Sequence, residues 1–383
     1  MKIIFDRIKV SNAIAPLMAT ASNHSTTTAS EGILIEAKKP NTVIFTTYDL
    51  EKGMRTAFEA EVIEEGYFII NAQKFNQALH VMENDTVTLT VDDRFRASIT
   101  SGKANISMNA LDGEDFPAVP ALKSEMGFYI GQSVFRKMLQ KTTYAMATID
   151  QREVLNGCFV HVDDDSITVV ACDGFKIAYC RRNALIKKGN EEDTYISYSF
   201  ILPVKTAAEV NRLLSDDEAA EMRIFLMRKH MVCEIGNIVF FSRIIEGEYI
   251  DYERLIIKNH KITLEADKDE LMSALERASL ITEEKVAASV RSHVKLSVND
   301  NTLEVSAVSV NGSSYDEVKI NHEGEDIVIA FNNRFLIDSL RSCDTESVRF
   351  SLSTPLTGMN IEPVGEEDGV EEVYTIQPIR MKE

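Results

Sequence analysis

The stretch GFYIGQSVFRKMLQKTTYAM, residues 127–146, contains the unit from which the chain is built. Its first four residues have the composition of a short strand. Apolar side chains then recur at helical spacing, with Val134 and Phe135 followed one turn later by Met138 and Leu139. We therefore expect a strand at 127–130 that runs directly into an amphipathic helix.

The same pattern occurs twice more at nearly constant distance. A strand at 3–10 precedes a helix at 11–22, and a strand at 261–266 precedes a helix at 267–282. The anchor residues Phe5, Tyr129 and Ile262 are 124 and 133 residues apart. A period of this kind indicates repeated copies of one unit. We expect three domains, at residues 1–123, 124–257 and 258–383.

Each copy contains a second unit of the same kind. Its strands and helices are expected at 66–71 with 72–83, 197–202 with 204–214, and 326–331 with 332–342. Alternating segments divided by Asp and Asn residues follow the helices, and they read as hairpins. The predicted fold is α+β, with six half-domains of strand, helix and antiparallel meander.

Composition excludes several classes of protein. The 383 residues are 44% hydrophobic and 26% charged, as in a globular protein, and no window approaches the 18 apolar residues of a membrane span. The five cysteines form no C-x-x-C pair, and charges interrupt the apolar N-terminus, which is not a signal peptide. We expect a cytoplasmic protein without disulfides or zinc.

Motifs for catalysis are absent from the sequence. It contains no phosphate-binding loop, no G-x-G-x-x-G, no G-x-S-x-G and no H-E-x-x-H. The acidic run 163–165 offers oxygen ligands, but its place between two strands favours a turn. The seven histidines show no ligand spacing. We predict no catalytic residue, no metal and no cofactor.

Charge is divided unevenly between helices and the rest of the chain. The net charge is -19, yet the six predicted helices hold ten Lys and Arg against six Asp and Glu. Lys137 and Lys141, four residues apart, are expected to project together, as are Arg334 and Arg341. One interpretation is a helical face that meets a polyanion. The other is that helices simply tolerate Lys and Arg.

Short stretches spread over the whole chain resemble one known family, the bacterial sliding clamp, the beta subunit of DNA polymerase III. No single stretch is specific, but their order, the threefold repeat, the length and the acidic pI together are. The stretches are 48–53, 101–103 with 115–117, 144–147, 155–157, 173–174, 201–203, 331–332 and 374–380.

The resemblance implies a non-catalytic processivity factor for DNA replication. It implies a head-to-tail homodimer that closes into a ring, with helices lining a hole for duplex DNA and sheets outside. Lys and Arg on the helices would contact phosphates without reading bases. The residues expected to contact DNA are Lys74, Lys137, Lys141, Arg152, Lys205, Arg212, Arg277, Arg334 and Arg341. The first predicted helix carries no charge and should contribute least, and Pro16 should kink it.

The resemblance further implies a groove between the second and third domains. It would bind short peptides of the replicative polymerase, the clamp loader and repair proteins. Gln377 stands where family members carry Met, which predicts weaker binding of a generic family peptide. The matching residues are Leu155, Cys172, Gly174, Phe175, Lys176, Ile177, Ile250, Arg254, Leu255, Asn332, Phe335, Leu356, Thr375, Gln377, Pro378, Ile379 and Arg380.

The dimer interface matches residues of the first and third domains. They are Lys74, Ala78, Arg96 and Lys103 on one side, and Leu280 and Ile281 on the other. Neighbouring residues of a helix point in different directions, so a lone helix cannot bury both Leu280 and Ile281 on one core face.

A second reading of the whole chain stays open at this point. It is a repeat-built enzyme or ligand-binding protein, with Asp173, Lys176 and Arg254 in a pocket between domains for a small acidic ligand.

Overall fold

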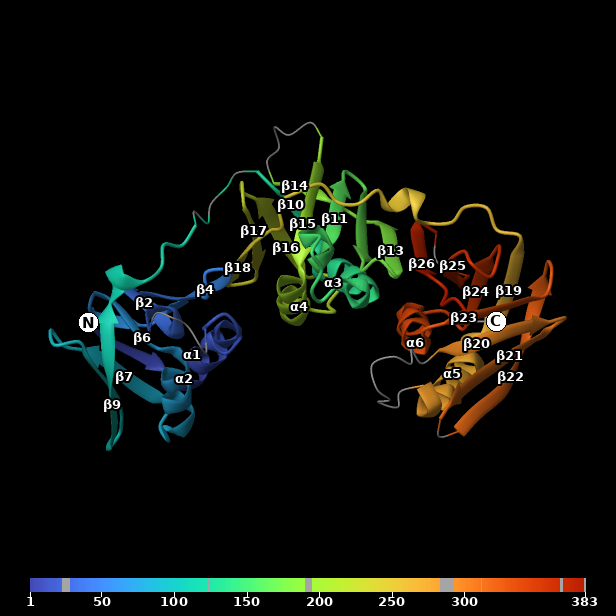
Figure 1. Cartoon of the computed structure of the whole chain (residues 1–383). Coiled ribbons are helices and arrows are strands. Elements are labelled where there is room, and N and C mark those ends of the chain that lie inside the picture. Colours follow the sequence, from blue (N-terminus) through green and yellow to red (C-terminus); the bar gives the residue numbers. More distant parts are fainter. Residues whose placement is uncertain are drawn as a thin grey trace. The chain divides into compact units, whose positions relative to one another are not determined.

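The computed structural model describes residues 1–22, 28–120, 122, 124, 126–189, 195–282, 293–310, 312–365 and 368–381. Its element order shows one pattern six times: a strand, an α-helix and an antiparallel meander (Figure 1). This is the α+β repeat that the hydrophobic periods predict. None of the described helices is long and apolar enough to cross a membrane.

The chain divides into two compact units, and each unit contains one continuous sheet. Unit 1 comprises Met1–Ser133, Lys187–Thr194 and Arg212–Ile244, and unit 2 comprises Val134–Ile186, Tyr195–Asn211 and Ile245–Glu383. The strands of the expected central domain are therefore shared between the two sheets.

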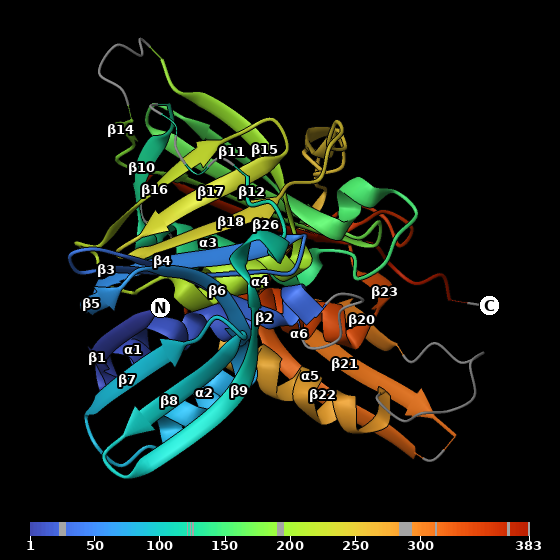
Figure 2. The same ribbon diagram turned by 90° about the vertical axis from the view of Figure 1, so that its left-hand side faces the viewer.

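The sheet of unit 1 has fourteen strands in the order β14-β10-β16-β17-β18-β4-β3-β2-β6-β9-β8-β7-β1-β5. The strands are β1 (Lys2–Asp6), β2 (Gly32–Lys38), β3 (Thr42–Tyr48), β4 (Lys52–Glu59), β5 (Glu61–Glu64), β6 (Gly66–Asn71), β7 (Thr86–Val91), β8 (Arg96–Ser101), β9 (Ala104–Asp112), β10 (Phe128–Gly131), β14 (Lys187–Lys188), β16 (Glu221–Leu226), β17 (His230–Ile235) and β18 (Ile238–Arg243). Helices α1 (Arg7–Ile14) and α2 (Ala72–Val81) pack against each other, and α2 contacts β2 and β6 (Figure 2).

The sheet of unit 2 has twelve strands in the order β15-β11-β12-β13-β26-β25-β24-β19-β22-β21-β20-β23. They are β11 (Gly157–Asp163), β12 (Ser166–Cys172), β13 (Lys176–Asn183), β15 (Ser197–Pro203), β19 (Ile262–Asp267), β20 (Val294–Asn299), β21 (Thr302–Ser309), β22 (Gly312–Glu323), β23 (Ile327–Phe331), β24 (Ser347–Leu352), β25 (Met359–Val364) and β26 (Val370–Ile376). Helix α5 (Lys268–Thr282) packs on α6 (Asn333–Ser342) and on β20, β21 and β22. Helices α3 (Gln132–Thr142) and α4 (Val204–Leu213) begin or end at the boundary between the units.

Strands exchange between the two halves of each repeat. The strand before a helix pairs with the meander of the other half: β1 with β7, β6 with β2, β10 with β16, β15 with β11, β19 with β24 and β23 with β20. This exchange explains why no half can bury its apolar face alone. The acidic run 163–165 is indeed a turn, because β11 pairs with β12 around it and the Asp164 side chain accepts a hydrogen bond from the Ile196 amide.

The first helix differs from the prediction. It begins at Arg7, because the Asp6 side chain accepts a hydrogen bond from the Lys9 amide at 2.9 Å and caps the helix four residues earlier than expected. Pro16 does not kink a long helix; it opens a separate 3-10 turn, Pro16–Ala19, where its missing N–H leaves no bond unmade. The expectation of an uncharged first helix is therefore wrong, since α1 contains Arg7 and Lys9.

Candidate functional sites

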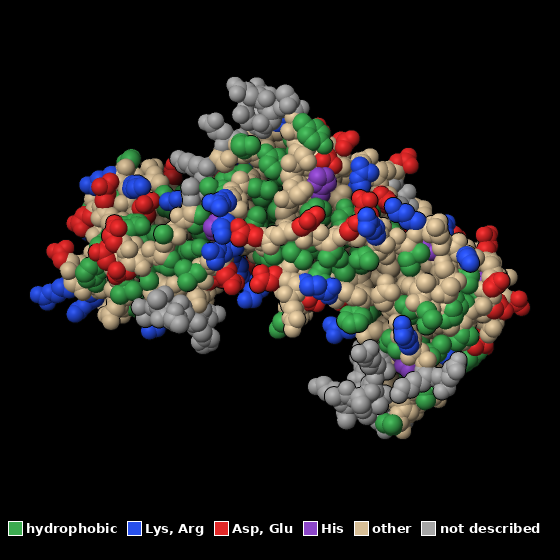
Figure 3. Space-filling view, turned by 45° about the horizontal axis from the view of Figure 1, so that its top comes forward, with side chains coloured by type: hydrophobic (Ala, Val, Ile, Leu, Met, Phe, Trp, Pro, Cys, Tyr) green, Lys and Arg blue, Asp and Glu red, His purple; other side chains and the backbone are tan. Residues whose placement is uncertain are grey.

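The α-helices carry a positive charge larger than the sequence suggested. Within their observed bounds, the six described α-helices hold twelve Lys and Arg against five Asp and Glu. Elsewhere acidic and basic side chains are interspersed, as the face drawn in Figure 3 shows. Exposed Lys9 on α1 belongs with the basic helix residues and was missed because the helix start was placed too late.

Most of the cations expected to contact DNA lie on the surface. The side chains of Lys74, Lys137, Lys205, Arg212, Arg277, Arg334 and Arg341 are all exposed. Several also have acidic neighbours: Arg277 hydrogen-bonds Asp316, Arg341 lies 3.4 Å from Glu276, and Arg334 lies 3.7 Å from Asp338. The bond from Arg277 lowers the pKa of Asp316. These helices thus present a positive charge that acidic neighbours partly compensate.

Lys141 is the exception, and its expected projection beside Lys137 is wrong. Its side chain is buried, and its Nζ lies 2.7 Å from the Glu372 carboxylate and 2.9 Å from that of Asp344. Nζ also donates to the Ser342 carbonyl at 3.1 Å. Burial by itself would lower the pKa of Lys141, but the hydrogen bonds and charges of the two carboxylates outweigh it and raise that pKa. Lys141 joins α3 to β26 and is unavailable to a ligand.

Residues expected to form the peptide groove lie together in unit 2. Leu155, Cys172 and Ile177 are buried in one apolar cluster, and Ile250 packs against it. The pairing of β13 with β26 places Thr375 opposite Ile177. The chain then continues beside the same turn, because the Gln377 amide donates to the Phe175 carbonyl at 2.8 Å. The structure therefore brings the C-terminal stretch onto this cluster.

Three apolar residues expected in the groove are exposed. Phe175, Leu255 and Leu356 have 58%, 43% and 69% of their surface exposed. Farther along the chain, the Ile379 amide donates to the Ala330 carbonyl at 2.7 Å. Of the remaining expected residues, Gly174, Gln377 and Arg380 are exposed, Thr375 is buried, and Asn332, Phe335, Pro378 and Ile379 are partly buried.

One charged residue expected in the groove, Lys176, serves the fold instead. It is buried, bonds to Asp173 and lies 4.2 Å from the ring centre of Phe335. Arg254 pairs with Asp251 at 2.8 Å on the surface, where its side chain is 85% exposed. Of the three residues that the enzyme reading placed in a ligand pocket, Asp173 and Lys176 are thus bonded to each other and Arg254 is bonded to Asp251.

Arg152 lies beside the groove residues. It forms an ion pair with Asp150 at 3.1 Å, and its guanidinium lies 3.0 Å from where a Cβ on Gly174 would stand. The structure places it next to the turn that begins β13.

A hollow of about 790 Å³ lies between α2 and β9 in unit 1. Lys74 and Ala78, both expected at the dimer interface, line it. Arg96 and Lys103 are exposed but are not among its lining residues. Val81, Ile106 and Met108 also line it, although they are not among the residues predicted for the interface. Ile106 and Met108 could have been predicted to share one face of a strand, because they alternate with polar residues after the turn at Gly102.

The other expected interface residues lie at the end of α5 in unit 2. Leu280 is 77% exposed and Ile281 is partly buried. The Ile281 side chain lies 3.5 Å from where a Cβ on Gly312 would stand, at the start of β22. One of the two adjacent residues is therefore left on the surface.

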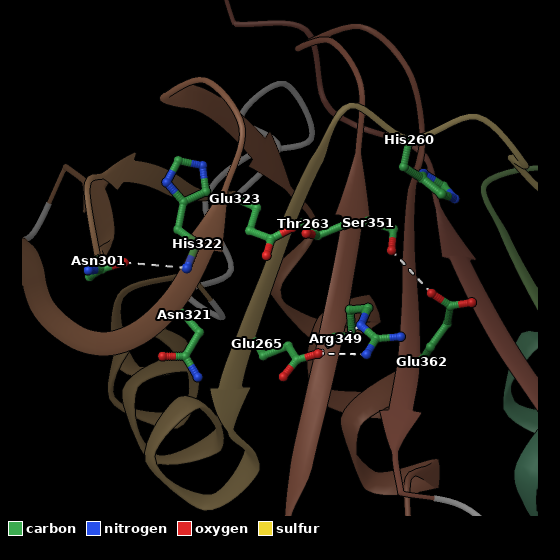
Figure 4. Close-up of a pocket in the computed structure, with 10 residues that line it drawn as sticks. All are labelled: His260, Thr263, Glu265, Asn301, Asn321, His322, Glu323, Arg349, Ser351 and Glu362. Atoms are coloured by element: carbon green, nitrogen blue, oxygen red, sulfur yellow. Dashed lines mark hydrogen bonds and ion pairs between the residues drawn. The ribbon is translucent and has the colours of Figure 1, made fainter.

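A second hollow, of about 700 Å³, opens on the sheet of the third repeat (Figure 4). Its polar side chains are largely paired: Arg349 bonds Glu265 at 2.6 Å, and Ser351 donates to Glu362 at 3.1 Å. His260 and His322 stand at different ends of it (Figure 4). Among the described residues no group of three His, Cys, Asp or Glu side chains could hold a metal ion.

Three family models together match almost the entire chain. The N-terminal, central and C-terminal domains of the DNA polymerase III beta subunit match residues 1–120, 129–251 and 253–378. The chain belongs to the beta sliding clamps. The clamp is a non-catalytic factor of DNA replication, and this membership removes the enzyme reading.

Similar proteins agree with this membership over their whole length. The clamp is 28% identical to the beta sliding clamp of Staphylococcus aureus, over 91% of both chains, and 26% identical to that of Chlamydia muridarum, over 100% of this chain and 99% of that one. Among solved structures, the DNA polymerase sliding clamp of Bacillus subtilis superposes with a TM-score of 0.91 at 22% identity, over 100% of both chains. The DNA polymerase III subunit beta of Pseudomonas aeruginosa gives 0.89 at 25%, over 99% of this chain and 100% of that one.

Proposed function

We propose that two copies of this clamp join head to tail, enclose duplex DNA and bind polymerase and other partners through short peptides. One observation carries the dimer. The two seams, by which we mean the strand pairings that join successive repeats, are built in the same way, and among the described residues one strand edge of each type stays unpaired.

Both seams pair the third strand of the first meander of one repeat with the third strand of the second meander of the next repeat. The first seam joins β4 to β18, and the second joins β13 to β26. In the order of the repeat, β22 corresponds to β4 and β13, whereas β9 corresponds to β18 and β26.

These two remaining strands each have an open edge. In the part of the chain that the structure describes, residues 104–109 of β9 pair only with β8, and residues 312–319 of β22 pair only with β21. An exposed strand edge is a template for another strand. The β9 edge of one copy and the β22 edge of another would therefore form a third seam like the first two.

The register of this third seam follows from the repeat. In the first seam Phe240 pairs with Met54. Phe240 is two residues beyond the start of β18, as Ile106 is beyond the start of β9. Met54 is two residues beyond the start of β4, as Ser314 is beyond the start of β22. We expect Ile106 of one copy to lie opposite Ser314 of the other. A head-to-tail joint of this kind closes into a ring when its rotation permits.

Apolar side chains complement each other at the same place. Leu280 is exposed at the end of α5, next to β22, and Val81 is 68% exposed in the hollow beside β9. The hollow would receive Leu280 of the other copy, where central apolar anchors contribute most to binding.

The exposed cations of the helices supply the interaction with DNA. Lys9, Lys74, Lys137 and Arg334 project from helices with few acidic residues, and a polyanion would displace the weak surface pairs that the arginines make. Such contacts depend on phosphate charge and not on base identity. The clamp would then hold DNA by enclosing it rather than by affinity.

The apolar cluster of unit 2 supplies the peptide site. Exposed Phe175, Leu255 and Leu356 provide anchoring surface, and the side-chain amide of exposed Gln377 provides a hydrogen-bonding group beside them. The exposed cations among the residues expected there are Arg254 and Arg380, and Arg152 lies beside the turn at Gly174, whereas Lys176 is buried and bonded to Asp173.

Sedimentation of a Leu280→Asp variant tests the dimer. The variant removes the apolar anchor and brings a carboxylate into a hollow that is lined by Glu31 as well as Lys74, so we expect the wild-type dimer to become a monomer at micromolar concentration. Leu185→Asp is the matched control, because Leu185 is 76% exposed and lies between β13 and β14, away from both open edges. A Leu280→Asp protein that stays dimeric would show that the seam lies elsewhere.

A further inference from the structure

We propose that the first seam carries a second docking site, for a partner segment that combines carboxylates with an apolar anchor. It lies wholly within unit 1 and is centred on Leu50 and Arg243. The proposal rests on the proposed function only in assuming that partners of this clamp bind by short segments.

The turn at the first seam repeats the turn of the peptide site. Asp49 and Asp173 each accept hydrogen bonds through Oδ1 from the amides two and three residues farther along the chain, at 2.7 to 3.0 Å. The Asp49 amide donates to the Lys52 carbonyl, as the Asp173 amide does to that of Lys176. Each turn therefore has the same backbone path.

The strand that leaves each seam is held in the same way. The Arg243 amide donates to the Glu51 carbonyl at 2.9 Å, as the Gln377 amide donates to the Phe175 carbonyl at 2.8 Å. An apolar cluster that includes Tyr48, Ile69 and Phe241 lies at this turn, as the cluster with Cys172 and Ile177 lies at the other. Arg243 thus occupies the position that Gln377 has at the peptide site.

Leu50 is the feature that points to a ligand. Its φ is 76°, in the left-handed region that favours glycine, and the corresponding residue at the peptide site is Gly174 with φ 88°. The Tyr48 hydroxyl donates to the Leu50 carbonyl at 3.1 Å and holds the turn in place. Half of the Leu50 surface is exposed. The fold needs only a glycine here, so a strained, exposed leucine is explained by what it contacts outside the chain.

The charges around Leu50 select the occupant. Arg228, Lys229 and Arg243 are all exposed near this turn, since the Ile244 amide donates to the Lys229 carbonyl and His230 pairs with Arg243 in the sheet. The turn itself contains two acids, Asp49, whose Oδ1 accepts the bonds of the turn, and Glu51.

The backbone of Arg243 is fixed beside this turn by the hydrogen bond from its amide to the Glu51 carbonyl. Burial first, and then the charge of Arg243, lower the pKa of His230, and the same charge acts on Tyr48. In a chain of net charge -19 this is a local basic rim around an apolar residue. The guanidinium of an arginine can donate two parallel hydrogen bonds to one carboxylate, whereas a glutamine, as found at the corresponding position 377, cannot.

Fluorescence anisotropy with the full-length clamp tests the site. The probe is a fluorescein-labelled peptide, Ser-Glu-Glu-Leu-Phe-Asp-Leu-Glu-Ser. We expect Leu50→Gly and Arg243→Glu each to weaken its binding by about tenfold or more. Leu50→Gly also removes backbone strain, so the variant keeps its fold, and circular dichroism with thermal unfolding verifies this for both variants.

Phe175→Ala separates this site from the peptide site of unit 2. We expect Phe175→Ala to leave binding of the acidic probe unchanged and to weaken binding of a glutamine-containing apolar peptide. We expect Leu50→Gly to weaken binding of the acidic probe and to leave binding of the glutamine-containing peptide unchanged. If the glutamine-containing peptide does not bind but the acidic probe does, the peptide site of unit 2 is overturned and this proposal is not. Three results would overturn the second site. The acidic probe could bind both unit 1 variants as tightly as the wild type, it could lose its binding only in Phe175→Ala, or it could fail to bind the wild type at about 1 mM.

Discussion

At the scale of single residues, the buried Lys141 shows how a basic residue of a helix can serve the fold instead of a ligand. Its two carboxylate partners come from β26 and from the stretch just after α6, and Tyr374 also donates to Glu372 at 2.8 Å. Replacing Lys141 by Met leaves Glu372 buried with an uncompensated charge. We expect the free energy of unfolding to fall by about 3–5 kcal/mol, measured by urea denaturation.

Two further variants make the Lys141 prediction specific. Lys137→Met, on the exposed side of α3, should cost less than about 0.5 kcal/mol. Adding Glu372→Met to Lys141→Met should restore part of the loss, because the pair is then replaced by apolar side chains. Since its pKa is raised in the fold, the charge of Lys141 stabilises the protein below the ordinary lysine value of 10.5 and ceases to do so as the pH rises through the raised pKa. Equal losses for Lys137→Met and Lys141→Met would contradict the ion-pair assignment.

At the scale of elements, the stretch after β26 is the part of the peptide site that can be removed without breaking a strand. Strand β26 ends at Ile376, and in the described residues that follow, 377–381, the Gln377 and Ile379 amides make the backbone hydrogen bonds to the rest of unit 2. Deleting residues 377–383 should abolish binding of a glutamine-containing apolar peptide in calorimetry, while sedimentation still shows a dimer. Retained peptide affinity would place the peptide site elsewhere, and a monomer would mean that the stretch is structural.

At the scale of the whole molecule, retention on DNA should depend on the topology of the DNA. A closed ring cannot leave a circle sideways but can slide off a free end. After loading by a clamp loader, we expect the clamp to stay on nicked circular plasmid and to be lost when a restriction enzyme linearises it, as measured by gel filtration. Leu280→Asp should abolish retention on the circle, and Leu185→Asp should not. Equal retention on both forms would exclude enclosure as the mode of binding.

Periodicity allowed the elements to be predicted because it is a local property. The stretch 127–146 was expected to form a strand and a helix, and it forms β10 and α3 within a few residues. The hairpin around 163–165 was equally clear from its Asp residues. The start of α1 was missed because alternating apolar residues continue past Asp6, and only the cap reveals that the chain has turned.

The candidate sites were predictable in kind but not in detail. The family resemblance predicted that Leu155, Cys172, Ile177 and the C-terminal stretch belong to one site. The structure places the three residues in one apolar cluster and brings the C-terminal stretch beside it. The resemblance did not reveal that Lys176 is buried and bonded to Asp173, nor that Ile106 and Met108 line the hollow beside α2. Whether a charged side chain is available depends on partners that periodicity does not report.

By itself the sequence determined the repeat, the α+β class and the placement of most helices and strands, because hydrophobic spacing along the chain sets local structure. Only the tertiary structure decided which strands pair, which edges stay open and which cations remain on the surface. Those properties depend on contacts between residues far apart in the chain, such as Lys141 with Glu372 and Arg243 with Glu51. A side chain's spacing gives its direction on an element, but what it meets there is set by the element packed against it.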